Sequence, residues 1–291
     1  MGARHVQANG RRFAYLEQGP RDGPLALCLH GFPDHAPTWR HLLPTLADAG
    51  YRAVAPWLRG YAPTEVPPHR VTPPARLTAD VNALHRALGG DERAVLVGHD
   101  WGAVFAARAA TAAPERWRSL ATMAVPPERT LLHHPPDAAQ AARSWYMLLA
   151  QLPGAERAFA RDDFALVEQL WRTWSPGYEP DTDDLRRIKA TLDDPGGLRA
   201  ALSYYRGMAI EMAGVVAGRR RLPAPPGQPH LVLHGEDDGC IGVELARAAT
   251  AVLAHPASRV EVLPAVGHFL QLEAPGRVGE LVLDHLDVAH H

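Results

Sequence analysis

The sequence predicts an α/β protein in which a doubly wound, mostly parallel sheet is interrupted by a helical insertion. Short apolar runs alternate with segments of helical periodicity over residues 25–125. The alternation then stops, and it resumes after a proline-rich linker at residues 223–229. Strands that alternate with helices form parallel sheets. We therefore expect residues 1–125 and 223–291 to form one core, with residues 126–222 inserted as a lid.

The first part of the core begins with a hairpin. Asn9 and Gly10 form a two-residue turn signal within residues 5–18. Residues 25–29 are apolar without interruption, which is typical of a strand buried on both faces of a parallel sheet. The next elements follow from the same criteria. We expect strands at residues 52–56, 93–97 and 119–125 and helices at residues 38–49, 77–88 and 102–113.

The insertion and the second part of the core differ in pattern. Residues 126–222 have several helical patterns and no clear strand, and they include Trp145, Trp171 and Trp174. After the linker, apolar strand patterns return in alternation with helical ones. We expect strands at residues 231–234 and 260–263 and helices at residues 243–253 and 276–286.

The composition excludes several classes of protein. The 291 residues are 46% hydrophobic and 21% charged, which is typical of a soluble globular protein. The net charge of −2 indicates neither a nucleic-acid partner nor an anionic membrane. There is no run of about 18 apolar residues that could span a membrane, and the first ten residues lack the apolar stretch of a signal peptide. Abundant alanine, arginine and proline are typical of a GC-rich bacterial genome.

The two cysteines, Cys28 and Cys240, do not form a disulfide framework. Cys28 lies within an apolar strand pattern, where a free buried thiol is usual. A reducing compartment follows from this, and we expect a cytoplasmic protein. No sequence feature indicates the oligomeric state.

The segment of residues 98–102 predicts a nucleophile. Gly98 and Gly102 flank Asp100 at the spacing Gly-X-nucleophile-X-Gly, between a strand and a helix. Such a tight turn requires glycines, and it lifts the middle side chain above the sheet while the N–H of Trp101 faces the reacting centre. A carboxylate attacks carbon without a base at pH 7, because the reference pKa of Asp is about 3.9. The alternative is an ordinary turn in which Asp100 caps the helix.

A second backbone donor is expected from the loop after the first parallel strand. Residues 30–33 read His-Gly-Phe-Pro, and the N–H of Phe32 would complete an oxyanion hole with Trp101. Pro33 restricts this loop, and its peptide bond is either trans or cis. The alternative is an ordinary turn at the end of a strand.

An acid and a base follow later strands. Asp238 lies three residues after Gly235, and His268 follows the last expected strand. The order nucleophile, acid, histidine matches the hydrolase triad, and the carboxyl ends of parallel strands are where such sheets bind ligands. Asp237 is the alternative acid, and Asp238 is favoured over it by a modest margin. Glu128 would be the acid of a rearranged triad.

Together these motifs make the chain resemble the epoxide hydrolase branch of the α/β-hydrolase superfamily, which includes the haloalkane dehalogenases. The resemblance covers nearly the whole length, and the set of motifs is specific where single members are not. It implies an α/β-hydrolase fold with a helical lid and two lid tyrosines, Tyr146 and Tyr205, that hold an epoxide oxygen. The motifs are residues 30–33, 59–61, 98–102, 203–207, 235–238 and 267–269.

The resemblance implies epoxide hydrolysis through an ester of Asp100, which water activated by His268 then hydrolyses. The partners are a small apolar epoxide and water, and no cofactor or metal is required; His133 and His134 lack a recognised ligand spacing. One alternative is a haloalkane dehalogenase, although Phe32 stands where dehalogenases commonly present a polar halide ligand. Another is a catalytically silent member that binds a small ligand.

Overall fold

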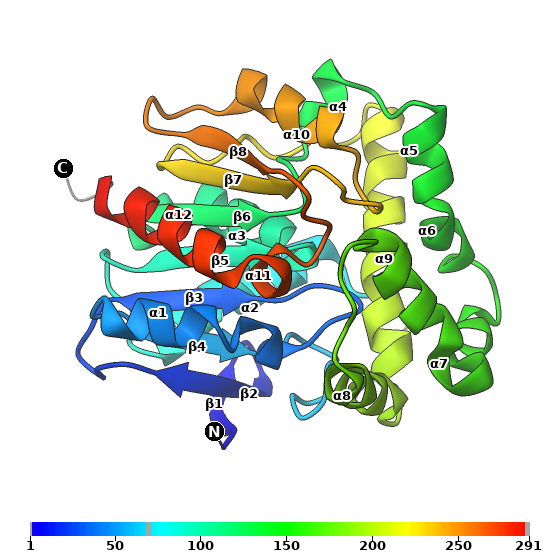
Figure 1. The fold of residues 1–291 in the computed structure, drawn as a ribbon, viewed down its shortest axis with the longest axis horizontal. Coiled ribbons are helices and arrows are strands. Elements are labelled where there is room, and N and C mark those ends of the chain that lie inside the picture. Colours follow the sequence, from blue (N-terminus) through cyan, green and yellow to red (C-terminus); the bar gives the residue numbers. More distant parts are fainter. Residues whose placement is uncertain (1, 68–70, 289–291) are drawn as a thin grey trace.

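An eight-stranded sheet forms the centre of the computed structural model, which describes residues 2–67 and 71–288 (Figure 1). The strand order is β1-β2-β4-β3-β5-β6-β7-β8. β2 pairs antiparallel with β1 and with β4, and the other neighbouring strands are parallel. The strands are β1 (Arg4–Ala8), β2 (Arg11–Gln18), β3 (Leu25–Leu29), β4 (Arg52–Pro56), β5 (Val95–His99), β6 (Ser119–Met123), β7 (His230–Gly235) and β8 (Arg259–Leu263).

The expected fold class is confirmed. The hairpin around Asn9 and Gly10 forms β1 and β2, and every residue of β3 and β5 is buried, as uninterrupted apolar runs require. The bounds of several strands differ from the expectation by one or two residues. β5 continues to His99, and β6 ends at Met123 because Ala124 adopts a left-handed conformation with φ 67°.

Helices cover both faces of the sheet. In Figure 1, α1 and α12 lie in front of it, and α2 and α3 lie behind. α2 begins three residues before the expected start, with prolines in its first turn, where a missing N–H costs nothing. The core helices are α1 (Leu42–Asp48), α2 (Pro74–Ala87), α3 (Trp101–Ala112), α10 (Val243–Ala248), α11 (Leu270–Glu273) and α12 (Pro275–Val288), with the 3-10 helices η1 (Ala36–Trp39), η2 (Pro114–Arg116) and η3 (Ala249–Val252).

The prediction of a single continuous helix at residues 38–49 is wrong. The segment is divided into η1 and α1, with a turn between them. Pro44 lies in the first turn of α1, where it has no N–H to bond the carbonyl of Arg40. The helix therefore cannot continue backwards through Arg40.

Between β6 and β7 the described chain forms helices that gather at one end of the sheet (Figure 1). This helical insertion contacts the loops that follow β5 and β8, as the side-chain geometry below shows. No helix among the described residues is long and apolar enough to cross a membrane. The insertion contains α4 (Thr130–His133), α5 (Ala138–Arg143), α6 (Trp145–Leu149), α7 (Ala155–Trp174), α8 (Thr182–Asp193) and α9 (Gly197–Val216).

Candidate active site

Asp100 occupies the strained turn that the glycine spacing predicts. Its backbone has φ 52° and ψ −119°, a conformation that L residues rarely adopt. A β-carbon at Gly98 would overlap the carbonyl of Gly102, and one at Gly102 would overlap the carbonyl of Leu29. The Asp100 side chain makes no capping hydrogen bond to α3, so it does not act as an ordinary helix cap. The turn instead presents the carboxylate at the carboxyl end of β5.

Backbone amides contact the Asp100 carboxylate. The N–H of Phe32 donates to Oδ1 at 2.7 Å. The peptide bond that follows, between Phe32 and Pro33, is cis. Burial raises the pKa of Asp100, while His268 and hydrogen bonds from the backbone of Phe32 and Trp101 lower it. The two amides therefore favour the charged carboxylate.

His268 lies between Asp100 and Asp238. Its Nδ1 is 2.9 Å from Oδ2 of Asp238, and its Nε2 is 3.8 Å from Oδ2 of Asp100. Burial lowers the pKa of His268, but the two carboxylates outweigh it, so the pKa is raised. Burial also acts to raise the pKa of Asp238, yet His268 and backbone amides hold it below its usual range. Nε2 makes no hydrogen bond within the described residues, so it has capacity for one to a water molecule.

The geometry distinguishes the three candidate acids. Asp238 is buried, and its Oδ1 accepts the backbone N–H groups of Cys240 at 2.7 Å and Ile241 at 2.9 Å. Asp237 is exposed. Glu128 is bonded to the guanidinium of Arg108 through both of its oxygens, at 2.6 and 2.7 Å. Asp238 is therefore the acid that the structure brings to His268.

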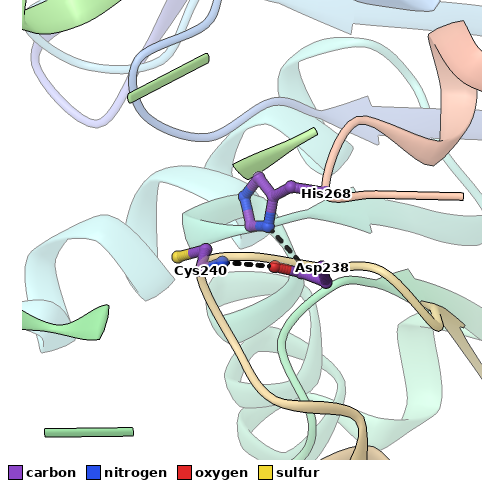
Figure 2. A group of neighbouring side chains, drawn as sticks. All are labelled: Asp238, Cys240 and His268. Atoms are coloured by element: carbon purple, nitrogen blue, oxygen red, sulfur yellow. Dashed lines mark hydrogen bonds and ion pairs between the residues drawn. The ribbon is translucent and has the colours of Figure 1, made fainter. Parts of the chain in front are cut away.

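Asp238, Cys240 and His268 form a group that has the residue types of a metal site (Figure 2). Their potential ligand atoms lie within 4.8 Å of one another. Both oxygens of Asp238 and the Nδ1 of His268 already take part in hydrogen bonds. Burial raises the pKa of the Cys240 thiol, and a protonated thiol is a poor metal ligand. We interpret the group as part of the triad.

The two expected tyrosines lie above this centre. Tyr146 comes from α6 and Tyr205 from α9; both are buried, and their rings meet edge to face with centroids 5.6 Å apart. The Tyr205 ring also meets Trp101 at 4.9 Å and Phe32 at 5.5 Å. Burial raises the pKa of both phenols, and the charge of Asp100 adds to the effect, so both stay protonated. The hydroxyl of the neighbouring Tyr204 donates to the backbone carbonyl of Arg59 at 2.6 Å, away from this centre.

Three contacts of the site were not expected from the sequence. The Tyr146 hydroxyl lies 3.4 Å from Sγ of Cys240, two residues after the acid in the same loop. His99, on β5, lies 2.9 Å through Nε2 from the carbonyl of His268 and 3.8 Å through Nδ1 from Asp34. Burial raises the pKa of Asp34 to about 8. The sequence gives one indication of these contacts, which is that the residues lie within or next to the motifs.

Comparisons with known proteins agree with this geometry. The family model described as alpha/beta hydrolase fold matches residues 24–275. The chain is 31% identical to epoxide hydrolase 4 of Homo sapiens, over 95% of this chain and 76% of the human protein. It is also 31% identical to epoxide hydrolase A of Mycobacterium tuberculosis, over 98% of each chain.

Solved structures give the same result. An epoxide hydrolase from Bacillus megaterium, crystallised with an inhibitor, superposes with a TM-score of 0.85 at 25% identity, over 98% of this chain and all (100%) of that one. Epoxide hydrolase A from Mycobacterium thermoresistibile gives a TM-score of 0.81 at 30% identity, over 98% of both chains. The similarity thus covers the core and the insertion together.

Proposed function

The chain belongs to the epoxide hydrolase branch of the α/β-hydrolase superfamily, and from this premise we propose that it hydrolyses epoxides to vicinal diols through an ester of Asp100. One observation carries the proposal. The two oxygens of Asp100 face different groups, Oδ1 the amide of Phe32 and Oδ2 the imidazole of His268. This arrangement leaves Oδ2 to attack carbon while Oδ1 is held for the later step.

The first step opens the epoxide ring. Oδ2 of Asp100 forms a bond to an epoxide carbon, and the bond between that carbon and the epoxide oxygen breaks. The alkoxide that develops accepts a proton from Tyr205 or Tyr146, whose raised pKa values keep both phenols protonated at neutral pH. The product of the step is a hydroxyalkyl ester of Asp100 and a tyrosinate.

The second step hydrolyses the ester. Nε2 of His268 takes a proton from water, and the oxygen attacks the ester carbonyl carbon of Asp100. The N–H groups of Phe32 and Trp101 stabilise the negative charge on the former Oδ1. The tetrahedral intermediate expels the diol oxygen, which takes the proton from His268. Asp100 is left as a carboxylic acid, and its proton passes through solvent to the tyrosinate, so that both the carboxylate and the phenol are restored. Water is consumed, and neither step needs a metal ion or a cofactor.

We also propose that residues 126–222 act as a lid that selects an apolar substrate. Asp100 is only 6% exposed, and aromatic rings of the insertion pack over the catalytic groups. Trp174 lies 4.9 Å from the His268 ring, and Phe159 lies 5.9 Å from Phe32. Such surroundings favour small apolar epoxides, and they strengthen the electrostatic interactions at Asp100 by excluding water.

Haloalkane dehalogenation is the second candidate, and one observation favours it. The indole Nε1 of Trp101 is buried beside the Tyr205 phenol at the centre of the site, and an indole N–H can donate to a leaving halide. Phe32 contributes only an apolar side chain, however. A halide leaves as a stable anion and needs no proton, so the tyrosine pair would have no role. Epoxide hydrolysis uses every group of the site.

The decisive experiment traps the intermediate. Asp100 needs no base to attack, so His268→Gln should accumulate the ester, and intact-protein mass should rise by one epoxide located on Asp100 by peptide mapping. Asp100→Ala should gain no mass. If His268→Gln binds styrene oxide without gaining mass, Asp100 is not the nucleophile. A wild-type protein that binds the epoxide and forms no diol would be a silent binding member of the family.

A further inference from the structure

The carboxyl end of α7 contacts both loops that carry the acid and the base. The carbonyl of Trp174 accepts the N–H of Gly239, next to the triad acid, and the N–H of His268, each at 3.0 Å. A β-carbon at Gly239 would overlap backbone at the end of α7, and one at Gly267 would overlap Ser175. The two glycines are therefore required by the close approach of the insertion to the triad loops.

Ser175, the residue after α7, extends this contact. Its hydroxyl is fully buried, and it accepts the N–H of His268 at 2.9 Å and the N–H of Phe269 at 3.2 Å. The same hydroxyl donates to Oε1 of Glu273 at 2.5 Å. Because a hydroxyl has one donor and two acceptor sites, these bonds use its full capacity. Ser175 thus joins the helical insertion directly to the backbone of the catalytic histidine.

Glu273, in α11, completes the arrangement from the core side. Its Oε2 accepts the N–H of Gly267 at 2.8 Å, and its Oε1 accepts the N–H of Phe269 at 3.0 Å. A carboxylate only accepts hydrogen bonds, and bonds to an ionised acceptor are roughly twice as strong as neutral ones. The backbone is held on both sides of His268 as a result.

We propose that Ser175 and Glu273 are positioning residues for His268 in ester hydrolysis. The inference rests on the proposed function and extends it, because the insertion then serves the water step as well as the epoxide. The bond from His268 to Asp238 depends on two separate loops, and the end of α7 gives both loops a common point of attachment. A shift of that point moves the base relative to the acid and to the ester carbonyl.

The two half-reactions should respond differently to a change at these residues. Oδ1 of Asp100 is held by Phe32, on a loop that neither Ser175 nor Glu273 contacts in the hydrogen bonds described, so ring opening should stay within about twofold of the wild-type rate. Ester hydrolysis should slow by about 10- to 100-fold, since a misplacement of about 1 Å costs that much. The alkylated fraction of the enzyme at steady state should therefore rise.

Each substitution tests a different bond. Ser175→Ala removes the hydroxyl that accepts the N–H groups of His268 and Phe269, and these groups keep only the carbonyl of Trp174 and Oε1 of Glu273 as acceptors. Glu273→Gln keeps one acceptor oxygen and turns the other into an NH₂ group that faces a backbone N–H, so one side of the loop is released. It also removes a negative charge that raises the pKa of His268. The acid limb of ester hydrolysis should move to lower pH in Glu273→Gln and not in Ser175→Ala.

The experiment mixes each variant rapidly with styrene oxide, quenches it in acid, and measures diol and the alkylated fraction by intact-protein mass. Both steps are measured in one sample, so a partly unfolded population lowers both rates and leaves their ratio unchanged. Thr191→Ala removes a hydroxyl of the insertion that bonds only its own helix, and Glu280→Gln removes an exposed carboxylate; both should match the wild type.

Each outcome decides one question. A raised ester fraction in both test variants, with both controls unchanged, supports the inference. Equal slowing of both steps, or no change in their ratio, overturns it and leaves the proposed function intact. If the wild-type protein forms neither ester nor diol, the proposed function itself fails, and that result is independent of the two positioning residues.

Discussion

Replacing Asp238 with asparagine should change the tautomer of His268 and block ester hydrolysis. Oδ1 of Asp238 accepts the N–H groups of Cys240 at 2.7 Å and Ile241 at 2.9 Å. Asparagine must present its carbonyl oxygen to these two donors, so its NH₂ group must face Nδ1 of His268. Nδ1 then has to accept a hydrogen bond, and the ring proton moves to Nε2. In that tautomer Nε2 cannot take a proton from water.

The size of the effect follows from the loss of the base. A wrong histidine tautomer costs on the order of 10⁴-fold in rate, which corresponds to about 5.5 kcal/mol. Ring opening uses Asp100 and the tyrosines, so it should stay within about tenfold of the wild-type rate. Asp238→Asn should therefore become almost completely alkylated after one turnover and release diol only slowly.

Single-turnover mixing with styrene oxide, followed by intact-protein mass and diol analysis, measures both steps. Asp237→Asn is the matched control, because that side chain is exposed in the same loop, and it should behave as the wild type. If Asp238→Asn hydrolyses its ester at a rate close to that of the wild type, the backbone amides do not dictate the side-chain orientation and the reasoning is refuted.

Four further predictions follow from the same geometry. Tyr205→Phe should slow ring opening by about 10- to 10⁴-fold, and unchanged single-turnover kinetics would make Tyr205 a packing residue. Diol formation from epoxides should be faster than halide release from 1-haloalkanes of similar size, and the reverse ranking would favour the dehalogenase. Ester hydrolysis should slow as pH falls, since His268 must be neutral to act as base. The pH midpoint of this step, from pH-jump single turnovers, should lie below the pKa of His268 in the unalkylated enzyme, because alkylation removes the Asp100 charge that helps to raise that pKa. A midpoint equal to or above the value in the unalkylated enzyme would contradict this. Finally, burial lowers the pKa of His230 to about 3, so the folded state loses stability as pH falls below 6.5. This residue alone should lower the free energy of unfolding by about 2 kcal/mol at pH 5. Urea unfolding above pH 6.5 and at pH 5 should show a smaller loss of stability for His230→Gln than for the wild type, and an equal loss would exclude His230 as a cause.

The sequence by itself determined the core fold and the tight turn at Asp100. Uninterrupted apolar runs can be buried on both faces only in the middle of a parallel sheet, and this predicts β3 and β5 directly. The glycines around Asp100 are required by contacts within a few residues or with the adjacent strand. These features depend on local patterns, so they can be read without knowing how distant segments pack.

Some local features were still misread for a local reason. The apolar spacing over residues 38–49 predicts one helix, although Pro44 already prevents a continuous hydrogen-bond ladder. The periodicity was correct about which side chains face the core, including Leu42, Leu43 and Leu46. It gave no information about the break, because a hydrophobic pattern reports burial and not backbone bonding.

Only the tertiary structure decided which residues complete the site. Asp237 and Asp238 are neighbours in sequence, and the amides of Cys240 and Ile241 together with His268 select the second. Ser175 and Glu273 are 98 residues apart and have no motif in common, yet a 2.5 Å hydrogen bond joins them beside His268. Such contacts form when the insertion packs onto the carboxyl end of the sheet, and no spacing along the chain encodes that approach.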